Sequence, residues 1–365
     1  MAALLCSAAA LSAADGKEVF RHDTFGDERF WTDTLRMHEV IPKAVDPTTA
    51  LSVGLKVDAD ALPPGILKTA DLKSPATTVA LLKLNAVVGL KGTVVTKDGK
   101  DTLEKVGITC ALCHSTVDDS VMPGIGKRLD GWPNRTLNPG AIIALSPALD
   151  DAKKKVYQSW GPGKYDPRFN QDGKNGPVVI PPAYGLANSK HATYTGDGDI
   201  SYWNNYVSVT QMGGQGAFKE PRLGIDVPSP GPDMVKSKLP ALKDYQHSIA
   251  APKPPAGSFD AASAKRGSVV FTGAARCGSC HRGVALTDDK MHDPQETGMD
   301  AAYAMRSASK KYRTTPLRGL WQHPPYFHDG SAASLDAVVD HYVKALKLSL
   351  SAEQRKDLVE YLKSI

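Results

Sequence analysis

Two short runs of the chain, Cys110–His114 and Cys277–His281, have the pattern Cys-x-x-Cys-His. Two thiols three residues apart can add across the two vinyl groups of one porphyrin, and the adjacent histidine can bind the iron. A single run of this kind could also be half of a zinc site or a redox-active thiol pair. Two runs, each closed by a histidine, predict two covalently bound haems c with His114 and His281 as the proximal iron ligands.

The position of the fifth cysteine indicates an exported protein. Four of the five cysteines lie in the two motifs, and the fifth is Cys6. It lies in an apolar stretch over residues 2–11, which small residues follow, as in a secretory signal cleaved before Asp15. We therefore expect residues 1–14 to be a signal peptide, truncated because the basic start is missing, and the mature protein to be periplasmic.

Composition argues against two classes of partner. The formal net charge of +5 is small for 365 residues and does not indicate nucleic-acid binding. No later apolar run reaches the ~20 residues that span a bilayer. Solvated lysines are sufficient to explain the charge, and a basic rim that docks a small acidic redox protein, such as a cytochrome or a cupredoxin, is the more specific interpretation.

A proline-rich stretch at residues 251–257 is typical of a stiff linker. It predicts an N-terminal haem domain over residues 15–250 and a C-terminal cytochrome c domain over residues 258–365. The first domain should contain a β-hairpin around Lys97-Asp98-Gly99-Lys100 that leads into the first haem motif. Residues 136–201 are rich in Gly, Pro, Asp and Asn and are expected to be mostly loop.

The C-terminal domain carries clear helix signals. Asp260 can cap a helix over residues 261–271, which contains Gly267 as a possible helix contact. Ser351 and Gln354 form a capping box for a final helix whose apolar residues recur at helical spacing. We expect these two helices to cross, as in cytochrome c. Beyond the haem motifs, no internal repeat is expected.

The run from Thr315 to Tyr342 contains the segments Leu-Arg-Gly, Tyr-Phe-His-Asp-Gly and Val-Asp-His-Tyr. It resembles the C-terminal haem domain of the bacterial di-haem cytochrome c peroxidase superfamily, which includes quinone-cofactor-maturing enzymes and di-haem rubber oxygenases. The resemblance implies a mainly α fold with two cytochrome c-like haem domains, long loops and a small β-hairpin in the N-terminal domain. It also implies redox chemistry, either electron transfer or a peroxidase or dioxygenase reaction.

The same resemblance suggests how the second iron is completed. In peroxidases a methionine ends the helix after Tyr-Phe-His-Asp-Gly, and that position is Tyr342 here, as in tyrosine-ligated members. The Val-Asp-His-Tyr ending is closer to the rubber-oxygenase branch, in which a histidine of that helix is the ligand. His341 is therefore favoured over Tyr342, and only one of them can face the iron because adjacent helical residues point about 100° apart. A loop methionine is the third possibility: Met291, Met299 or Met305.

Two further residues of this run are expected near the second haem. Arg318 is suited to neutralise a haem propionate, with a plain surface arginine as the alternative. His328, within Tyr-Phe-His-Asp-Gly, is expected to support the surroundings of the haem and not to bind iron.

The first haem leaves its sixth ligand open. Met212 in a glycine-rich loop is a candidate thioether ligand, with His38 and His191 as alternatives. In the rubber-oxygenase branch, a tryptophan and a phenylalanine at similar spacing wall an open haem, and Trp203 and Phe218 match them here. Ordinary aromatic core is the competing interpretation. An open first haem would make the protein an enzyme acting on peroxide or dioxygen, whereas a strong ligand would make it an electron carrier.

Two other features of the family have weak counterparts. Peroxidases need a distal glutamate to move protons; no motif identifies one here, and Glu220 and Glu104 are merely available carboxylates. Some relatives hold calcium between their domains. Asp166, Asn170 and Asp172 offer oxygen donors in a glycine-rich loop, but their spacing is not that of an EF-hand, and a solvated loop is the simpler expectation.

Overall fold

The computed structural model describes residues 15–187 and 189–365, so the predicted signal peptide and Cys6 lie outside the described residues. Helices make up 41% of the structure and strands 13%, the strands pairing only in small two-stranded sheets. This confirms the mainly α fold. In the part of the chain that is described, no helix has the length and apolar character needed to cross a membrane.

The chain divides into two compact units. The first runs to Tyr184 and resumes over Asn204–Ile249, and the second comprises Gly185–Trp203 and Ala250–Ile365. The segment Gly185–Trp203, expected in the N-terminal domain, therefore groups with the C-terminal residues. Each unit has a hydrophobic core of its own, built around residues such as Leu82 and Leu137 in the first and Phe271 and Leu358 in the second.

The first unit opens with a helix over residues 15–22. Its other helical elements are η1 (Arg29–Thr34), α2 (Met37–Ala44), α3 (Pro47–Ser52), η2 (Ala59–Ala61), α4 (Ile66–Thr69), α5 (Pro75–Lys83), α6 (Ala111–His114), α7 (Pro139–Ala144), α8 (Asp151–Gln158), α9 (Phe169–Asp172), η3 (Pro221–Leu223), η4 (Lys236–Lys238) and α11 (Leu239–Ser248). Its strands are β1 (Val57–Asp58), β2 (Leu90–Lys97), β3 (Lys100–Ile108), β4 (Ser115–Val117), β5 (Ile125–Gly126), β6 (Arg128–Asp130), β7 (Lys164–Tyr165), β8 (Val178–Val179), β9 (Phe218–Glu220) and β10 (Ile225–Val227). Helix α10 (Ile200–Thr210) begins in the second unit and ends in the first.

The second unit contains fewer elements. They are α12 (Ala261–Thr272), η5 (Cys277–Ser279), β11 (Met291–His292), α13 (Pro294–Thr297), η6 (Ala304–Arg306), β12 (Tyr312–Arg313), η7 (Leu320–Gln322), α14 (Leu335–Ala345) and α15 (Ala352–Lys363).

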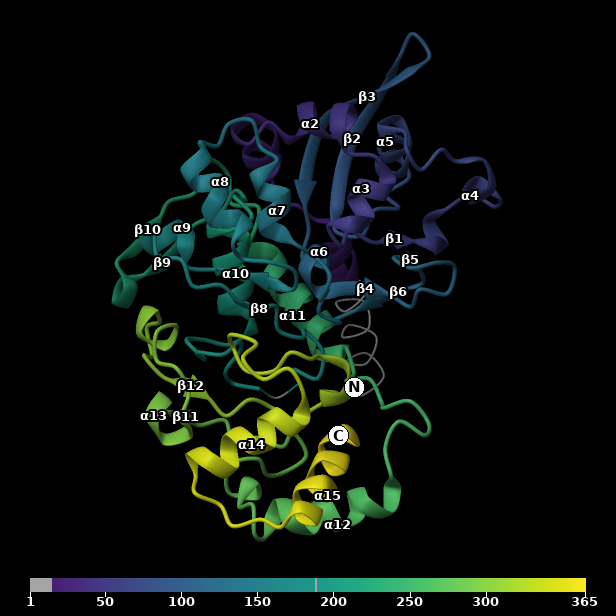
Figure 1. The fold of residues 1–365 in the computed structure, drawn as a ribbon. Coiled ribbons are helices and arrows are strands. Elements are labelled where there is room, and N and C mark those ends of the chain that lie inside the picture. Colours follow the sequence, from purple (N-terminus) through teal and green to yellow (C-terminus); the bar gives the residue numbers. More distant parts are fainter. Residues whose placement is uncertain (1–14, 188) are drawn as a thin grey trace, which may run out of the picture. The chain divides into compact units, whose positions relative to one another are not determined.

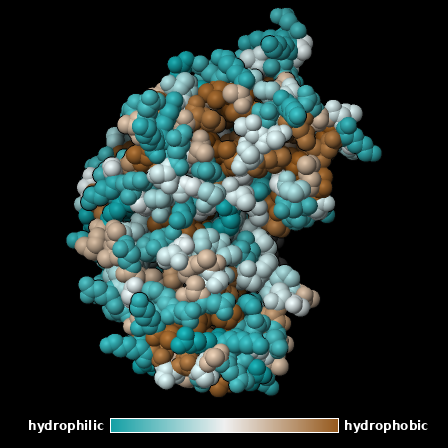
Figure 2. All heavy atoms as spheres, in the orientation of Figure 1, coloured by the Kyte–Doolittle hydropathy of each residue, from teal (hydrophilic) through white to brown (hydrophobic). Residues whose placement is uncertain are grey.

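The predicted hairpin is present, with its turn at Asp98 and Gly99. Strands β2 and β3 pair antiparallel with Lys97 opposite Lys100 (Figure 1). Asp98 and Gly99 both have positive φ, 50° and 73°, which a two-residue turn matched to the strand twist requires. Figure 2 shows hydrophilic residues over the tip of this hairpin and apolar residues nearer its base. The hairpin therefore delivers the chain from the exposed turn back to the core, directly before Cys110.

The predicted crossing of α12 and α15 is present in the second unit (Figure 1). At the closest approach, a Cβ added to Gly267 would lie 1.9 Å from the carbonyl oxygen of Asp357. Phe271, one turn later, packs edge-on against Tyr361 with ring centroids 5.1 Å apart. Both predicted caps are formed, by Asp260 on α12 and by the Ser351–Gln354 capping box on α15. Glycine is needed here because the two helix backbones touch.

The first unit repeats this crossing between its own first and last helices. A Cβ on Gly16 would lie 1.9 Å from the carbonyl oxygen of Ala241 in α11. Phe20, again four residues later, packs edge-on against Tyr245 at 5.5 Å. The expectation of no repeat beyond the haem motifs is therefore wrong: Gly-x-x-x-Phe occurs in both units with the same role.

Residues 136–201 are mostly loop, as expected, although they also contain helices that were not foreseen from the sequence. Helices α7 and α8 form within this stretch. Asn138 caps α7 by accepting a hydrogen bond from Ala141, with Pro139 at the first helical position, and Asp150 caps α8 by accepting one from Lys153. These are ordinary helix-start signals, and the high glycine and proline content around them obscured their meaning.

Replacing Gly267 with alanine should destabilise the second unit. Alanine gains about 1 kcal/mol of helix propensity over glycine, but its Cβ would have to displace the Asp357 carbonyl. We expect a net loss of about 1–3 kcal/mol in the free energy of unfolding, as for other overpacked sites. Chemical denaturation followed by circular dichroism measures it, with the exposed Lys265→Ala on the same helix as control. Equal stability of the two variants would contradict the close approach.

The same helix pair should make stability depend on pH. Hydrogen bonds from Arg266, and also from Ser263, lower the pKa of Asp357 below its ordinary value of 3.8. The unfolded state therefore takes up the proton first, so this contribution is present above about pH 3.8 and is lost as the pH falls through the folded-state value. Melting temperatures between pH 2.5 and 7 should fall less steeply on the acid side in Asp357→Asn. Asp98→Asn, in the exposed hairpin turn, should retain the profile of the unaltered protein.

Candidate haem-binding sites

The first haem motif lies on the short helix α6, which follows the hairpin strand β3 after two residues. Gly89, with φ of +81°, lets the base of the hairpin approach α6, since a Cβ there would lie 2.2 Å from Cα of Leu112. The carbonyls of Cys113 and His114 accept backbone hydrogen bonds from Asn134 and Gly131, at 2.9 and 2.8 Å. Strand and loop therefore fix the motif from both sides.

His114 is held in the orientation that a haem ligand requires. Its Nδ1 lies 3.1 Å from the carbonyl oxygen of Pro181, which can only accept a hydrogen bond, so Nδ1 carries the proton. The lone pair is then on Nε2, the nitrogen that remains for iron. Burial lowers the pKa of His114 to about 4, so the imidazole is neutral at physiological pH, which is the form that binds metal.

The second motif repeats this arrangement in the second unit. Its cysteines lie on and next to the 3-10 turn η5, and Nδ1 of His281 lies 3.0 Å from the carbonyl oxygen of Leu286. Leu286 has φ of +50°, and its N–H bonds the Gly283 carbonyl at 3.1 Å, so a tight turn supplies this acceptor. Burial lowers the pKa of His281 as well. Each motif therefore presents one neutral imidazole with Nε2 available.

The four motif cysteines are free thiols, and the surroundings of Cys110, Cys113 and Cys277 disfavour the thiolate form. Burial raises the pKa of Cys110 and of Cys113 to about 12, and that of Cys277 to about 11. Redox-active dithiols and zinc-binding cysteines work as thiolates and normally have a lowered pKa. For Cys110, Cys113 and Cys277, thioether bonds to a porphyrin suit a protonated thiol better than either alternative does.

His341 and Tyr342 differ clearly in their surroundings on α14. Nε2 of His341 lies 2.9 Å from the carbonyl oxygen of Thr297, so this nitrogen donates a hydrogen bond to the backbone. Tyr342 instead has its hydroxyl near the haem cysteines. Burial raises the pKa of Tyr342 to about 12, and the neighbouring Cys277 and Cys280 contribute to that shift.

Arg318 and His328 have the surroundings expected of supporting residues. Nη2 of Arg318 donates to the carbonyl of Val284 at 2.8 Å, while its buried Nε has no hydrogen-bond partner among the described residues. A carboxylate brought by a cofactor would satisfy that group. His328 is buried, stacked 4.7 Å from Tyr312, with Nε2 3.1 Å from the Tyr312 hydroxyl, and engaged in this way it is not placed as an iron ligand.

A tyrosine and a glutamine that the sequence did not single out lie beside the first motif. Tyr165, on β7, donates a hydrogen bond from its hydroxyl to Oε1 of Gln211 at 2.9 Å. Burial raises the pKa of Tyr165 well above its ordinary range, and Cys113 is the largest neighbouring contributor. Gln211 directly follows α10 and is buried, so the end of this helix reaches the surroundings of Cys113. No motif marks these two residues in the sequence.

The residues predicted around an open first haem are all buried. Phe218, on β9, packs edge-on against Tyr206 at 5.1 Å. Met212 is buried, and its carbonyl accepts a hydrogen bond from Trp31 at 3.1 Å. Trp203 is buried on the part of α10 that belongs to the second unit. Trp203 and Phe218 therefore belong to different units.

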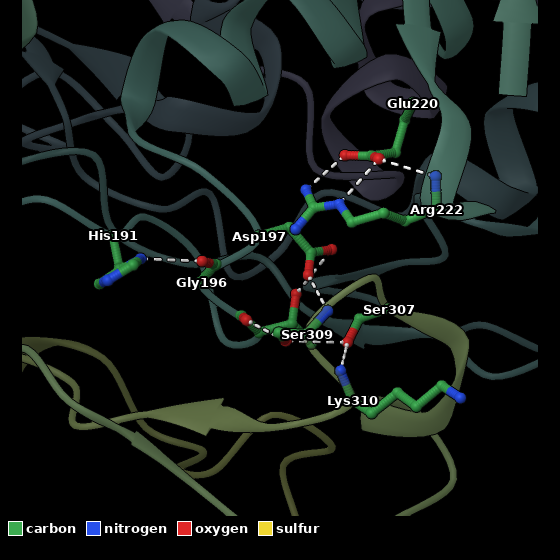
Figure 3. Close-up of polar contacts among 9 residues, drawn as sticks. His191, Gly196, Asp197, Glu220, Arg222, Ser307, Ser309 and Lys310 are labelled. Carbon is green, nitrogen blue, oxygen red and sulfur yellow. Dashed lines mark hydrogen bonds and ion pairs between the residues drawn. The ribbon is translucent and has the colours of Figure 1, made fainter.

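The two candidate distal carboxylates are distinguished by the structure. Glu104 is exposed on the hairpin and pairs with Lys97 at 2.8 Å. Glu220 is buried, with its carboxylate held by the Arg222 guanidinium at 2.5 Å (Figure 3). Of the two, Glu220 alone has the burial that proton transfer to a haem-bound substrate would need.

The segment before Trp203 is tied to the rest of the second unit by polar contacts. Asp197 accepts a hydrogen bond from the Ser309 N–H at 2.9 Å, and the Ser309 hydroxyl donates to the Thr195 carbonyl at 2.7 Å (Figure 3). His191 bonds the Gly196 carbonyl at 2.9 Å through Nδ1, within the same segment. These contacts explain why the segment groups with residues far away in sequence.

The oxygen donors considered for calcium are used within their own loop. The Asp166 carboxylate accepts backbone hydrogen bonds from Arg168, Phe169 and Gly176. Asp172 accepts one from Lys174, and Asn170 accepts one from the Tyr157 hydroxyl. Their hydrogen bonds are those of a self-supporting loop.

Part of the chain is similar to curated di-haem peroxidase-type proteins. It is 37% identical over 125 residues to the methylamine utilization protein MauG of Methylorubrum extorquens and 31% identical over 122 residues to that of Methylophilus methylotrophus. It is 26% identical over 150 residues to the cytochrome-c peroxidase IdrP1 of Pseudomonas sp. (strain SCT). Each match covers 28% of this chain and between 35% and 40% of the relative, so the chain spans little more than a third of the curated relatives it matches. No family model matches the chain.

Two solved structures align with part of the chain. Hydrazine synthase from Kuenenia stuttgartiensis, pressurised with xenon, aligns with 53% of this chain and 74% of its own, at 19% identity and a TM-score of 0.37. A MauG-like protein associated with microbial copper homeostasis aligns with 37% of this chain and 54% of its own, at 19% identity and a TM-score of 0.30. Both likenesses are too distant to argue from. The curated relatives confirm the predicted resemblance to the di-haem cytochrome c peroxidase superfamily.

Removing the Tyr165 hydroxyl should perturb the first haem alone. Tyr165→Phe breaks the hydrogen bond to Gln211 beside Cys113 and leaves the ring in place. We expect altered optical and paramagnetic resonance signals for the first haem and unaltered signals for the second. Tyr157→Phe, in the same aromatic cluster but bonded to the exposed Asn170, is the matched control. Identical spectra for both variants would place Tyr165 outside the haem surroundings.

Proposed function

We propose that this member of the di-haem peroxidase-like proteins is a periplasmic di-haem c-type cytochrome whose main task is electron transfer. The observation that carries the proposal is the matched pair of histidines. Each follows a Cys-x-x-Cys motif and donates Nδ1–H to a backbone carbonyl, that of Pro181 or Leu286. Haem c held at both sites would supply one-electron redox chemistry.

For the second haem we propose His281 and Tyr342 as the two iron ligands. This reverses the preference for His341 drawn from the sequence. The Tyr342 hydroxyl lies near Cys277 and Cys280, whereas the His341 nitrogen is engaged by Thr297. Arg318 would bind a propionate through its otherwise unsatisfied Nε.

For the first haem we propose His114 as the proximal ligand, with Met212 as the candidate sixth ligand if the site is closed. The partner would be a small acidic redox protein, a cytochrome or a cupredoxin. Close to the second motif in sequence, Val284 is 94% exposed, and Arg276 and Arg282 are exposed as well. An exposed apolar residue in a stretch with exposed arginines suits a transient complex with an acidic partner.

The alternative function is oxidoreductase chemistry at an open first haem, of the peroxidase or dioxygenase type. The observation that favours it is Glu220, a buried carboxylate that Arg222 keeps in a fixed position. Such a group could relay a proton during cleavage of an O–O bond. In that reading, Phe218, which belongs to the same unit as Glu220, would line the pocket in which peroxide or dioxygen binds.

Paramagnetic resonance of the fully oxidised protein, after haem staining and mass measurement have established two bound haems, tests these proposals. Electron transfer predicts two low-spin signals, and an open first haem predicts one high-spin signal for about half of the iron. Tyr342→Phe should abolish the second low-spin signal and His341→Gln should leave it intact. The opposite pattern would refute Tyr342 ligation, and a chain without covalent haem would refute the whole proposal.

A further inference from the structure

Phe327 lies in the loop before α14 and contacts both candidate ligands of the second haem, His341 and Tyr342. Its backbone is in the left-handed region, with φ of +66°, which a bulky residue adopts only when its neighbours enforce it. Tyr326, before it, bonds Ala332 through its backbone N–H at 2.8 Å and Leu320 through its hydroxyl at 2.7 Å. His328, after it, is fixed against Tyr312. The loop therefore holds Phe327 from both sides.

The ring of Phe327 packs on both residues that compete for the iron. Its centroid lies 4.8 Å from that of His341, at an interplanar angle of 56°, and 5.9 Å from that of Tyr342, at 80°. The two competing rings are themselves 5.2 Å apart and nearly perpendicular. One aromatic side chain thus sets the directions of two adjacent helical residues.

His341 is kept in its position by two contacts that act together. Its Nε2 donates to the Thr297 carbonyl at 2.9 Å, at the end of the capped helix α13. Gly298 follows with φ of +69°, and a Cβ there would lie 3.6 Å from the His341 ring, so the ring lies directly against this turn. Phe327 contacts His341 as well. For Nε2 to bind iron, His341 would have to give up the hydrogen bond and turn away from both neighbours.

We propose that Phe327 selects the sixth ligand of the second haem, by holding His341 on the Thr297 carbonyl so that Tyr342 alone faces the iron. This inference rests on the proposed ligation by Tyr342. Phe327 acts as a positioning residue, since it binds neither iron nor substrate. Its removal opens space for His341 to swing away from the Thr297 carbonyl, and imidazole is a common ligand of haem iron.

The test is paramagnetic resonance and near-infrared magnetic circular dichroism of the two-haem protein carrying Phe327→Ala. We expect loss of most of the histidine–tyrosine signal of the second haem and the appearance of a bis-histidine signal, with the signals of the first haem unchanged as an internal standard. Phe327→Tyr retains the ring and should retain the original spectrum. The double variant Phe327→Ala/His341→Gln removes the competitor and should restore the histidine–tyrosine signal.

Two outcomes separate the possible failures. If Phe327→Ala keeps the original spectrum while Tyr342→Phe changes it, Tyr342 ligation holds and the selecting role of Phe327 is refuted. If Tyr342→Phe leaves the spectrum unchanged, the ligation is wrong and the inference falls with it. Should the alanine variant fail to bind two haems, Phe327→Asn removes the ring at a residue type that tolerates positive φ, and the same spectra decide.

Discussion

The hydrogen bond from a histidine Nδ1 to a backbone carbonyl is the constraint on which both sites depend. An imidazole without it could rotate or change tautomer, and Nε2 would no longer point reliably at an iron. The fold supplies the acceptor by different means in the two units: Pro181 closely follows β8, which pairs with β7, whereas Leu286 is part of a tight turn. Because a backbone acceptor cannot be removed by a single side-chain change, the ligand orientation is built into the chain path.

The same helix crossing serves as the frame of each unit. Gly16 and Gly267 allow backbone contact, and Phe20 and Phe271 pack on Tyr245 and Tyr361. The second helix of each crossing, α11 or α15, also shares a sequence pattern with its counterpart. Residues 242–249 and 358–365 both have leucine first, an acidic residue third, tyrosine fourth, and serine and isoleucine last. The first unit differs by what it adds to this frame, chiefly the hairpin and the helices around α7 and α8. The two units share the helix crossing but differ in the elements around it, which agrees with the proposal that the two haem sites have different functions.

Local signals in the sequence were sufficient for much of this structure. The Asp98-Gly99 turn and the caps at Asp260 and Ser351 each depend on a few adjacent residues, and each forms as predicted. Features that depend on contacts across the chain were not foreseen. Tyr165 meets Gln211 across 46 residues, and His341 meets Thr297 across 44. The Gly-x-x-x-Phe repeat was visible in the sequence but has meaning only once the crossing partner is known.

The competition between His341 and Tyr342 shows why spacing alone could not identify the ligand. A tyrosine whose pKa is raised to about 12 is protonated at neutral pH and must lose that proton to bind iron as a phenolate. A neutral imidazole needs no such step. On intrinsic chemistry the histidine would win, and the sequence preference followed that logic. For Tyr342 to bind, the protein must restrain the better-prepared competitor, and a hydrogen bond to Thr297 together with the ring of Phe327 are the contacts that do so. Under the proposed ligation, geometry more than basicity decides which of the two neighbouring residues reaches the metal.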